Sequence, residues 1–562
     1  MVSKLVTFRS IWRLALLISG CGAPATPRVT PSSGAIDLVV VGGDIRTMDP
    51  AHPHAQALAI AGGSIVALGD SDAIRTMATS TTRVIDVHGA TITPGLIDAH
   101  CHLYGLGVDN DSVSVRALAS EAETVKVVVE AAAARPAGEW LLGRGWDQNR
   151  WPGQQFPTKA SLDAAISDRP VVLRRIDGHA SWVNSKALAA ANITKATKDP
   201  AGGTIVRDAK GEPTGVLIDN AAELVAAVMP VATPEMIERR IRGASQQAIA
   251  AGITGVHEMG IEDATAAVYT KLAASHQLPL RVYAYLAGDP AHLERLATAP
   301  APATGRFVMR GVKFFADGAL GSRGARLYEP YLDEPKSSGL WVTEPKALMA
   351  GVESAVAHGW QVATHAIGDA GVGSTLDAYL AAERAHPGDH RLRVEHTQII
   401  APADIARMVQ AKAIASMQPT HATSDMPWAE QRIGAVRILG AYAWRTMLDQ
   451  KIPLAAGSDF PIEEVAPLLG IYAAVTRQDA KGNPAGGWHP EQKLTLDEAI
   501  AAFTTGAAYA EGAEATRGMI AIGRPADLTI YDRPLAADRT LLDTHVDFTI
   551  VEGEVVFDRG AK

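Results

Sequence analysis

One His-Cys-His segment of the sequence could hold a metal ion. His100 and His102 follow the apolar run 92–98, and side chains alternate in direction along a strand, so both imidazoles share one face while Cys101 faces the other way. Two imidazoles on one face can bind one divalent ion. A His-x-His motif on its own is more often incidental. Its interpretation therefore depends on which residues follow the other apolar runs.

Further metal-binding side chains follow later apolar runs. These residues are His365, His396 and Asp459, and the run 312–315 contains Lys313. Imidazole and carboxylate ligands without a thiolate fit Zn²⁺ best, with Fe²⁺, Mn²⁺ or Co²⁺ as alternatives. A lysine inside an apolar strand is costly unless its charge is neutralised. The pattern predicts a divalent metal centre with a buried lysine beside it.

The elements that carry these residues alternate between strand and helix. Thr233 predicts the start of a helix that ends near Gly252 and leads into a strand at 253–256, and Thr495 with Glu498 predicts a capping box on the last helix. Repeated strand–helix units indicate a parallel sheet, and their number favours a closed (β/α)8 barrel of TIM type. Strand ends converge on one rim of a barrel, so we expect the metal-binding residues to meet there.

The predicted organisation is α/β with one barrel and one smaller β-sandwich. The barrel occupies residues 93–514 and carries a long insertion at 103–235, after its first strand. Short apolar runs separated by turn signals fill 36–92 and 515–562. Neither end holds enough strands for a core of its own, so we expect both chain ends to build one small β-sandwich domain.

The first 20 residues are typical of a secretory signal, with a basic start, a short apolar core and the sequence Ile-Ser-Gly-Cys, which resembles a bacterial lipoprotein cleavage box. Cys21 is then the expected lipidation site, and residues 21–35 are the expected flexible tether. A plain signal peptide with an incidental cysteine is the alternative. We expect export across the inner membrane and a lipid anchor on the periplasmic or cell-envelope face, with the outer membrane favoured because Gly22 follows the cysteine.

Composition and charge exclude several classes of protein. The chain has 562 residues, 47% of them hydrophobic and 20% charged, which is the balance of a globular protein. A net charge of −9 without a basic cluster argues against nucleic-acid binding. Two cysteines exclude a disulfide framework. The expected partners are a small-molecule substrate and the membrane through the lipid, and a homodimer is permitted.

Seven segments of the chain resemble the amidohydrolase superfamily, specifically its family 3, which includes N-substituted formamide deformylase-like enzymes. They cover nearly the whole chain after the tether in the expected order. The segments are PGLIDAHCH (94–102), DGHASWVNSKAL (177–188), GVKFFADGALGSR (311–323), HAIGD (365–369), RVEHTQ (393–398), GSDFPIE (457–463) and RGMIAIGRPADLTIYD (517–532).

The resemblance implies a ligand set and catalytic roles. A carboxylated Lys313 would bridge two ions, whereas a lysine that pairs with a carboxylate such as Asp317 would leave one ion per chain. The catalytic residues implied are Asp459, His365 and Lys313, with Asp459 taking a proton from water and passing it to the leaving nitrogen. The metal ligands implied are His100, His102, Lys313, His365, His396 and Asp459.

Four further residues are candidate substrate contacts: His179 and Trp146 from the insertion, and Asp317 and Arg323 from the glycine-rich loop. A structural histidine and exposed loop charges are the alternatives. The expected enzyme is an amidohydrolase that cleaves a linear, non-peptide C–N bond, of the N-substituted formamide or N-acyl amide class, through metal-bound hydroxide. The same site could hydrolyse a cyclic amide, lactone or ester, and a non-catalytic metal- or ligand-binding lipoprotein is the second alternative.

Overall fold

A computed structural model describes residues 28–29, 35–288 and 293–561 of the chain. The expected signal segment and Cys21 lie outside the described residues, so both stay predictions. Within the described ranges, no helix combines the length and the apolar character that a membrane crossing requires.

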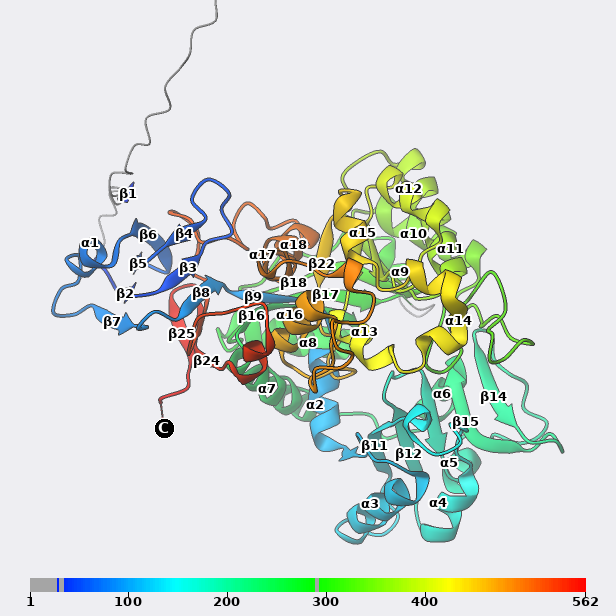
Figure 1. Ribbon diagram of the computed structural model, residues 1–562. Helices are drawn as coiled ribbons and strands as arrows, with labels where there is room; N and C mark the ends of the chain where they lie inside the picture. The colour runs from blue at the N-terminus through cyan, green and yellow to red at the C-terminus, as the bar shows by residue number, and fades with distance from the viewer. Residues whose placement is uncertain (1–27, 30–34, 289–292, 562) are drawn as a thin grey trace, which may run out of the picture.

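Eight parallel strands form the central barrel, and they follow one another around the sheet in chain order (Figure 1). The last strand also contacts the first, which nearly closes the sheet on itself. The predicted TIM-like barrel is confirmed. Its strands are β9 (Leu96–Cys101), β16 (Ile253–Ile261), β17 (Arg281–Ala287), β18 (Phe307–Phe315), β19 (Gln361–Ala366), β20 (Arg393–His396), β21 (Ile414–Met417) and β22 (Leu454–Ala456).

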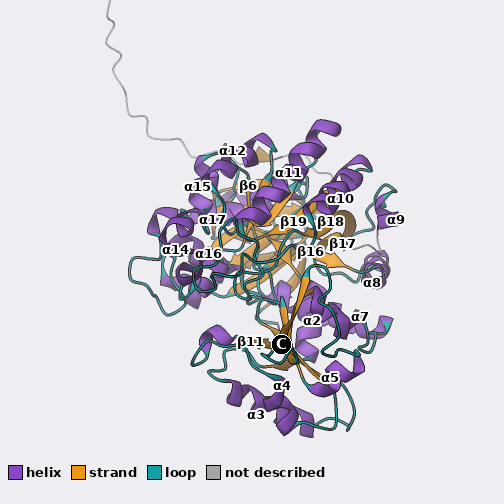
Figure 2. Cartoon of the chain, turned by 90° about the vertical axis from the view of Figure 1, so that its right-hand side faces the viewer, coloured by secondary structure: helices purple, strands orange, loops and turns teal. Residues whose placement is uncertain are grey.

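Helices surround this barrel (Figure 2). The N-caps are those that the sequence predicts: the Thr233 side chain accepts a hydrogen bond from the Met236 amide, and Thr495 and Glu498 form the capping box. The helices of the barrel region are α7 (Pro234–Ala250), α8 (Asp263–Ala274), α9 (Leu293–Leu296), α10 (Pro345–Ala357), α11 (Asp369–Ala385), α12 (Pro402–Gln410), α13 (Pro419–Asp425), α14 (Ala429–Arg437), α15 (Trp444–Asp449), α16 (Pro467–Thr476), α17 (Leu496–Ala502) and α18 (Thr505–Ala510).

Two sheets beside the barrel bring the chain ends together, and Figure 1 shows their blue and red strands side by side. One sheet has the order β1-β6-β5-β2-β7 and the other β25-β24-β23-β8-β3-β4. Strands β23 and β8 pair antiparallel, and one apolar cluster includes buried residues of both sheets. Their elements are β1 (Arg28–Val29), β2 (Leu38–Val41), β3 (Asp44–Arg46), β4 (His54–Ala55), β5 (Ala57–Ala61), β6 (Ser64–Gly69), α1 (Ser71–Arg75), β7 (Arg83–Asp86), β8 (Thr91–Pro94), β23 (Leu528–Tyr531), β24 (Val546–Val551) and β25 (Glu554–Asp558).

The sequence alone indicates one strand at the apolar run 92–98, but the structure has two. Strand β8 belongs to the sheet of the chain ends and β9 to the barrel, and Gly95 stands between them. At Gly95 the chain passes so close to Thr254 that a Cβ atom would lie 2.3 Å from its Oγ1. The glycine therefore lets the chain leave one sheet and enter the next without a clash.

Residues 113–219, which follow the first barrel strand in the chain, contain a separate six-stranded sheet. Figure 1 draws it in cyan to blue-green. Helices α3 and α4 pack on one face and α5 and α6 on the other, each against its own apolar cluster. The elements are α2 (Leu103–Asp111), β10 (Val113–Ser114), α3 (Glu121–Ala133), β11 (Leu141–Trp146), α4 (Lys159–Ala165), β12 (Val171–Arg175), β13 (Ala180–Val183), α5 (Ser185–Ala190), β14 (Gly203–Arg207), β15 (Pro213–Asp219) and α6 (Asn220–Ala226).

Candidate metal centre and active site

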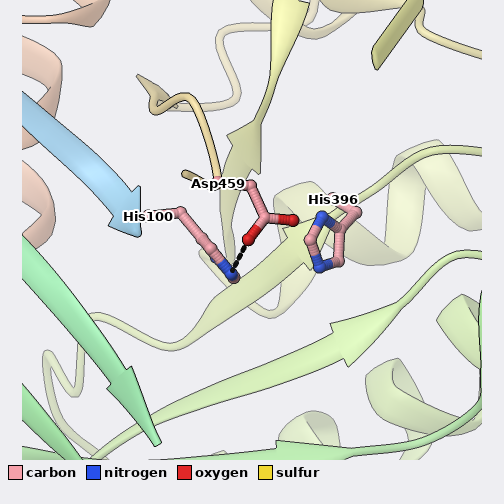
Figure 3. A group of neighbouring side chains, drawn as sticks. All are labelled: His100, His396 and Asp459. Atoms are coloured by element: carbon pink, nitrogen blue, oxygen red, sulfur yellow. Dashed lines mark ion pairs between the residues drawn. The ribbon is translucent and has the colours of Figure 1, made fainter. Parts of the chain in front are cut away.

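Three of the expected ligands meet at the carboxyl end of the barrel, although they come from distant parts of the chain. His100 is the penultimate residue of β9, His396 ends β20, and Asp459 follows β22. One ligand atom of each lies within 4.8 Å of the others, and all three residues are buried (Figure 3). Two imidazoles and a carboxylate at this spacing suit a divalent ion of the zinc type.

Asp459 is the centre of this group. Its Oδ1 lies 3.6 Å from His100 Nε2 and 3.2 Å from His102 Nε2. The same oxygen is buried and has no hydrogen-bond donor. Burial opposes ionisation of the carboxyl group, but His100 and His102 outweigh it and hold the pKa of Asp459 below its usual range. A buried, ionised oxygen with no donor beside two ring nitrogens is a position that a cation would satisfy.

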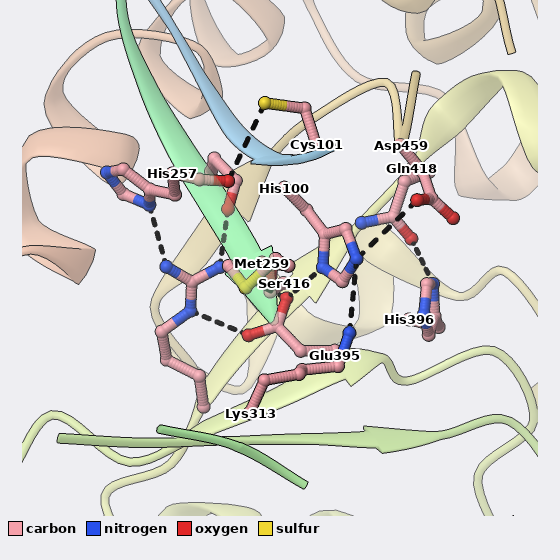
Figure 4. Close-up of polar contacts among 12 residues, drawn as sticks. His100, Cys101, His257, Met259, Lys313, Glu395, His396, Ser416, Gln418 and Asp459 are labelled. Atoms are coloured by element: carbon pink, nitrogen blue, oxygen red, sulfur yellow. Dashed lines mark hydrogen bonds and ion pairs between the residues drawn. The ribbon is translucent and has the colours of Figure 1, made fainter. Parts of the chain in front are cut away.

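His100 and His396 of the group, and His102 beside Asp459, each use Nδ1 for a structural contact, which leaves Nε2 for a metal ion. Figure 4 shows the contacts of His100 and His396. His100 Nδ1 lies 2.5 Å from Glu395 Oε2, His102 Nδ1 lies 3.0 Å from the Met259 carbonyl oxygen, and His396 Nδ1 lies 2.7 Å from Gln418 Oε1. Burial lowers the pKa of His100 and of His396 well below the usual value. Neutral rings with Nδ1 held by an acceptor present the lone pair that a metal ion needs.

Lys313 and His365 flank the group without belonging to it. Lys313 Nζ lies 3.4 Å from His100 Nε2 and 4.7 Å from the centre of the Phe315 ring. Burial lowers the pKa of Lys313 to about 8. The His365 ring lies 4.6 Å from the His396 ring. These two residues therefore lie next to the group, where they could contact a second ion or a reacting group.

The expected substrate contacts lie in different environments, and one of them, His179, lies beside His365 at the edge of the metal centre. The His179 ring lies 4.8 Å from the His365 ring, and His179 Nδ1 lies 2.6 Å from Asp219 Oδ1. The insertion thus delivers an imidazole to the barrel rim. Arg323, by contrast, pairs with Asp333 at 2.8 Å on a partly exposed loop.

Asp317 and Trp146 are engaged inside the protein. Asp317 is fully buried and accepts hydrogen bonds from three backbone amides of the loops around His365. Trp146 is fully buried in the core of the insertion, where its indole N–H donates to the Leu173 carbonyl oxygen at 2.7 Å. Asp317 therefore shapes the loop behind His365, and Trp146 packs in the core of the insertion.

His421 is a residue of the site that the sequence interpretation missed. It lies in α13, and its Nε2 is 3.6 Å from Asp459 Oδ2 and has no hydrogen-bond partner. Its ring stacks on His396 with ring centres 5.8 Å apart. The available signal was its position shortly after the apolar run 414–417, but a histidine on a short helix does not follow the strand-end pattern of the other ligands.

Comparison with known proteins agrees with this geometry. The amidohydrolase family model matches residues 83–557. A Bacillus subtilis protein named as the amidohydrolase YtcJ is 34% identical over 92% of this chain and 99% of its own, and N-substituted formamide deformylase of Arthrobacter pascens is 28% identical over 93% and 98%. The crystal structure of an uncharacterised metal-dependent hydrolase from Pyrococcus horikoshii has a TM-score of 0.71 at 28% identity, covering 92% of this chain and 99% of the other. With the barrel, the buried ligand group and a family match over most of its length, this chain belongs to the amidohydrolase family.

Proposed function

We propose that the protein is a metal-dependent hydrolase that cleaves a linear amide C–N bond of the N-substituted formamide or N-acyl amide class. The observation that carries the proposal is the group of His100, His396 and Asp459 at the carboxyl end of the barrel. The relative named N-substituted formamide deformylase supports the choice of bond.

Zn²⁺ is the ion that the site fits best, because its donors are imidazole nitrogens and a carboxylate and the buried Asp459 Oδ1 lacks a hydrogen-bond donor. When bound, such an ion supplies Lewis acidity, which polarises a carbonyl group and lowers the pKa of water towards about 7. The residues that would hold it are His100, His102, His365, His396 and Asp459, with Lys313 as a further ligand.

Asp459 is the proposed proton carrier. Its ionised carboxylate accepts the proton of the attacking water and returns it to the leaving nitrogen, which makes the amine a neutral leaving group. His365 stands beside His396 at the edge of the group, where its ring can stabilise negative charge on the former carbonyl oxygen.

Lys313 is the proposed bridging ligand. Its amine, with a pKa of about 8, is partly neutral near neutral pH. A neutral amine adds to the carbon of CO₂ and loses one proton, and the product is a carbamate anion with two oxygens. That group would remove the charge that makes a buried lysine costly and could hold two ions.

Purified, zinc-loaded variants test the proposal. We expect the wild-type protein to hydrolyse members of a panel of N-substituted formamides and N-acyl amides, and His100→Ala and Asp459→Ala to lose that hydrolysis. His358→Ala is the matched control, because His358 is an exposed histidine at the end of α10. Undiminished hydrolysis in both site variants would sink the proposal.

The same site chemistry also permits hydrolysis of a cyclic amide, a lactone or an ester, because water attacks each of these carbonyl groups in the same way. The panel therefore includes cyclic imides, lactones and esters. Rates for these classes that exceed the rates for linear amides would replace the substrate class and keep the site. Binding of zinc without any hydrolysis would favour a metal-binding lipoprotein.

We also propose that Cys21 carries a lipid anchor. In bacteria fed a labelled fatty acid, the wild-type protein should take up label and sediment with membranes, and Cys21→Ala should do neither. Cys101→Ala is the matched control, because Cys101 is the other of the chain's two cysteines. Label that persists in Cys21→Ala contradicts the anchor.

A further inference from the structure

Arg144 lies directly behind the loop that brings His179 to the metal centre. It is in β11 of the insertion, and its Nη2 donates to the Ile176 carbonyl oxygen at 3.2 Å. A Cβ atom on Gly178 would lie 3.5 Å from the same Nη2. The next residue is His179, whose ring lies 4.8 Å from His365. The guanidinium group is therefore close to the place where a substrate would meet the ligand residues.

Arg144 carries a positive charge that the Asp459 carboxylate attracts. Burial and neighbouring arginines lower the pKa of Arg144 to about 10, while attraction from Asp459 acts in the opposite direction. The Asp459 carboxylate also helps to raise the pKa of His179. With a pKa of about 10 the guanidinium stays protonated at neutral pH.

Arg144 has donors that the described part of the protein does not use. A guanidinium carries five N–H donors, and the Nε of Arg144 is buried without an acceptor. Its nearest carboxylate oxygen, Asp109 Oδ1, is 3.7 Å away, beyond hydrogen-bond distance. Arg175 on the neighbouring strand differs, because it binds Asp147, Asp177 and Gln148.

Arg144 shares its neighbouring carboxylate with a second arginine. Asp109 is shared with Arg116, which lies 3.5 Å from it. Arg174 stands opposite Arg144 in the parallel pairing of β11 with β12, and its charge lowers the pKa of Arg144. Arg116 donates to the carbonyl oxygens of Pro461 and Ile462, in the loop after Asp459. Asp109 is thus shared by two guanidinium groups and makes no hydrogen bond to Arg144, so the Arg144 guanidinium can still bind an anion.

We propose that Arg144 binds a carboxylate group of the substrate, and that the preferred substrates are N-acyl amino acids and not neutral amides. The inference rests on the proposed function, since it concerns the bond cleaved at the same site. In an N-acyl amino acid, the carbon that bears the amide nitrogen also bears the carboxylate. A substrate whose amide lies at Asp459 therefore carries its anion a short distance away, and a guanidinium binds a carboxylate through two parallel hydrogen bonds.

The test compares N-acetylleucine with N-acetylleucinamide, each in both enantiomers, on the zinc-loaded protein. The two compounds differ in charge and hardly in shape. We expect kcat/KM of the wild-type protein to favour the carboxylate by about 10- to 100-fold, which is the effect of a hydrogen-bonded charge pair. Arg144→Gln should abolish this preference mainly through KM for the carboxylate, and Arg144→Lys should restore part of it.

Arg174→Gln is the matched control, because it removes the same charge from the neighbouring strand at an exposed position. We expect it to keep the wild-type preference. An equal loss of preference in Arg174→Gln and Arg144→Gln would overturn direct binding by Arg144, as would an unchanged preference in Arg144→Gln. The wild-type comparison stands even where a variant does not fold, and equal rates for both compounds there also overturn the proposal.

Calorimetric titration of the same zinc-loaded proteins separates this proposal from the proposed function. If neither compound is hydrolysed, tighter binding of N-acetylleucine than of N-acetylleucinamide that is lost in Arg144→Gln supports the carboxylate site and contradicts the proposed reaction. If neither compound is hydrolysed and both bind equally or not at all, the carboxylate site is overturned. Hydrolysis of both compounds without discrimination keeps the reaction and removes the role of Arg144.

Discussion

His100 Nδ1 lies 2.5 Å from Glu395 Oε2, and both side chains are fully buried at the base of the metal centre. Arg393 binds the same carboxylate through two donors, at 2.7 Å and 3.0 Å. These two charge-assisted hydrogen bonds fix the position of the Glu395 carboxylate. The Glu395 carboxylate in turn accepts from His100 Nδ1, which leaves a lone pair on His100 Nε2.

Glu395→Gln should therefore weaken metal binding. The amide keeps the volume of the side chain but removes the charge that orients His100, and a change of this kind costs about 10- to 100-fold in metal affinity. Competition with a chromogenic chelator measures the zinc affinity of the variant. Glu353→Gln is the matched control, since Glu353 is exposed on α10. Equal affinity in both variants would contradict the role of Glu395.

Lys313→Arg tests the proposed carbamate with a side chain that keeps the positive charge of an unmodified lysine. Arginine cannot be carboxylated in this way, so a bridge between two ions would be lost and the zinc content should fall from about two ions to about one per chain. Elemental analysis of protein loaded with zinc in bicarbonate buffer gives the content. One ion per chain in the wild-type protein, with an unmodified lysine mass, would rule out the bridged pair.

Asp317 supports the loop behind His365. Its two oxygens accept from the amides of Ile367, Gly368 and Arg326 at 3.0, 2.8 and 2.7 Å. In Asp317→Asn one oxygen becomes an NH₂ group that cannot accept, so at least one buried amide loses its partner. We expect the free energy of unfolding to fall by about 2 to 4 kcal/mol, measured by urea denaturation.

The control for Asp317 is Asp389→Asn, which removes an exposed ion pair with Arg391 and should cost less than about 1 kcal/mol. A direct substrate contact by Asp317 would give a different result. In that case the variant would keep its stability and raise KM.

The sequence predicts the candidate ligands because their signals are local. A histidine or aspartate at the end of an apolar run is visible without a fold, and the barrel then brings His100, His396 and Asp459 to one rim. Helix caps are local in the same sense, and those at Thr233 and Thr495 form as the sequence predicts.

The residues that the sequence did not predict depend on long-range contacts. His421 and Arg144 have no pattern around them that points to a metal centre. Only folding brings His421 next to Asp459 and lets Asp459 attract Arg144. Trp146 is indistinguishable in sequence from an aromatic residue that lines a pocket, yet the packing of the insertion buries it. Local periodicity specifies a strand, but it does not specify which sheet the strand joins.

Gly95→Ala tests the point where the chain leaves one sheet for the next. The new Cβ would lie 2.3 Å from Thr254 Oγ1 and 2.4 Å from its Cγ2, closer than atoms can pack. Moving the junction of β8 and β9 away from β16, which contains Thr254, should lower the free energy of unfolding by about 1 to 3 kcal/mol. Thr254→Ala in the same chain removes the two closest atoms and should recover part of the loss.

Gly243→Ala in α7, where nothing lies within 4 Å, is the matched control and should stabilise the protein by up to about 1 kcal/mol. Urea denaturation of the three variants decides, and a Gly95→Ala protein as stable as the wild type would show that Gly95 and β16 are not held at this distance.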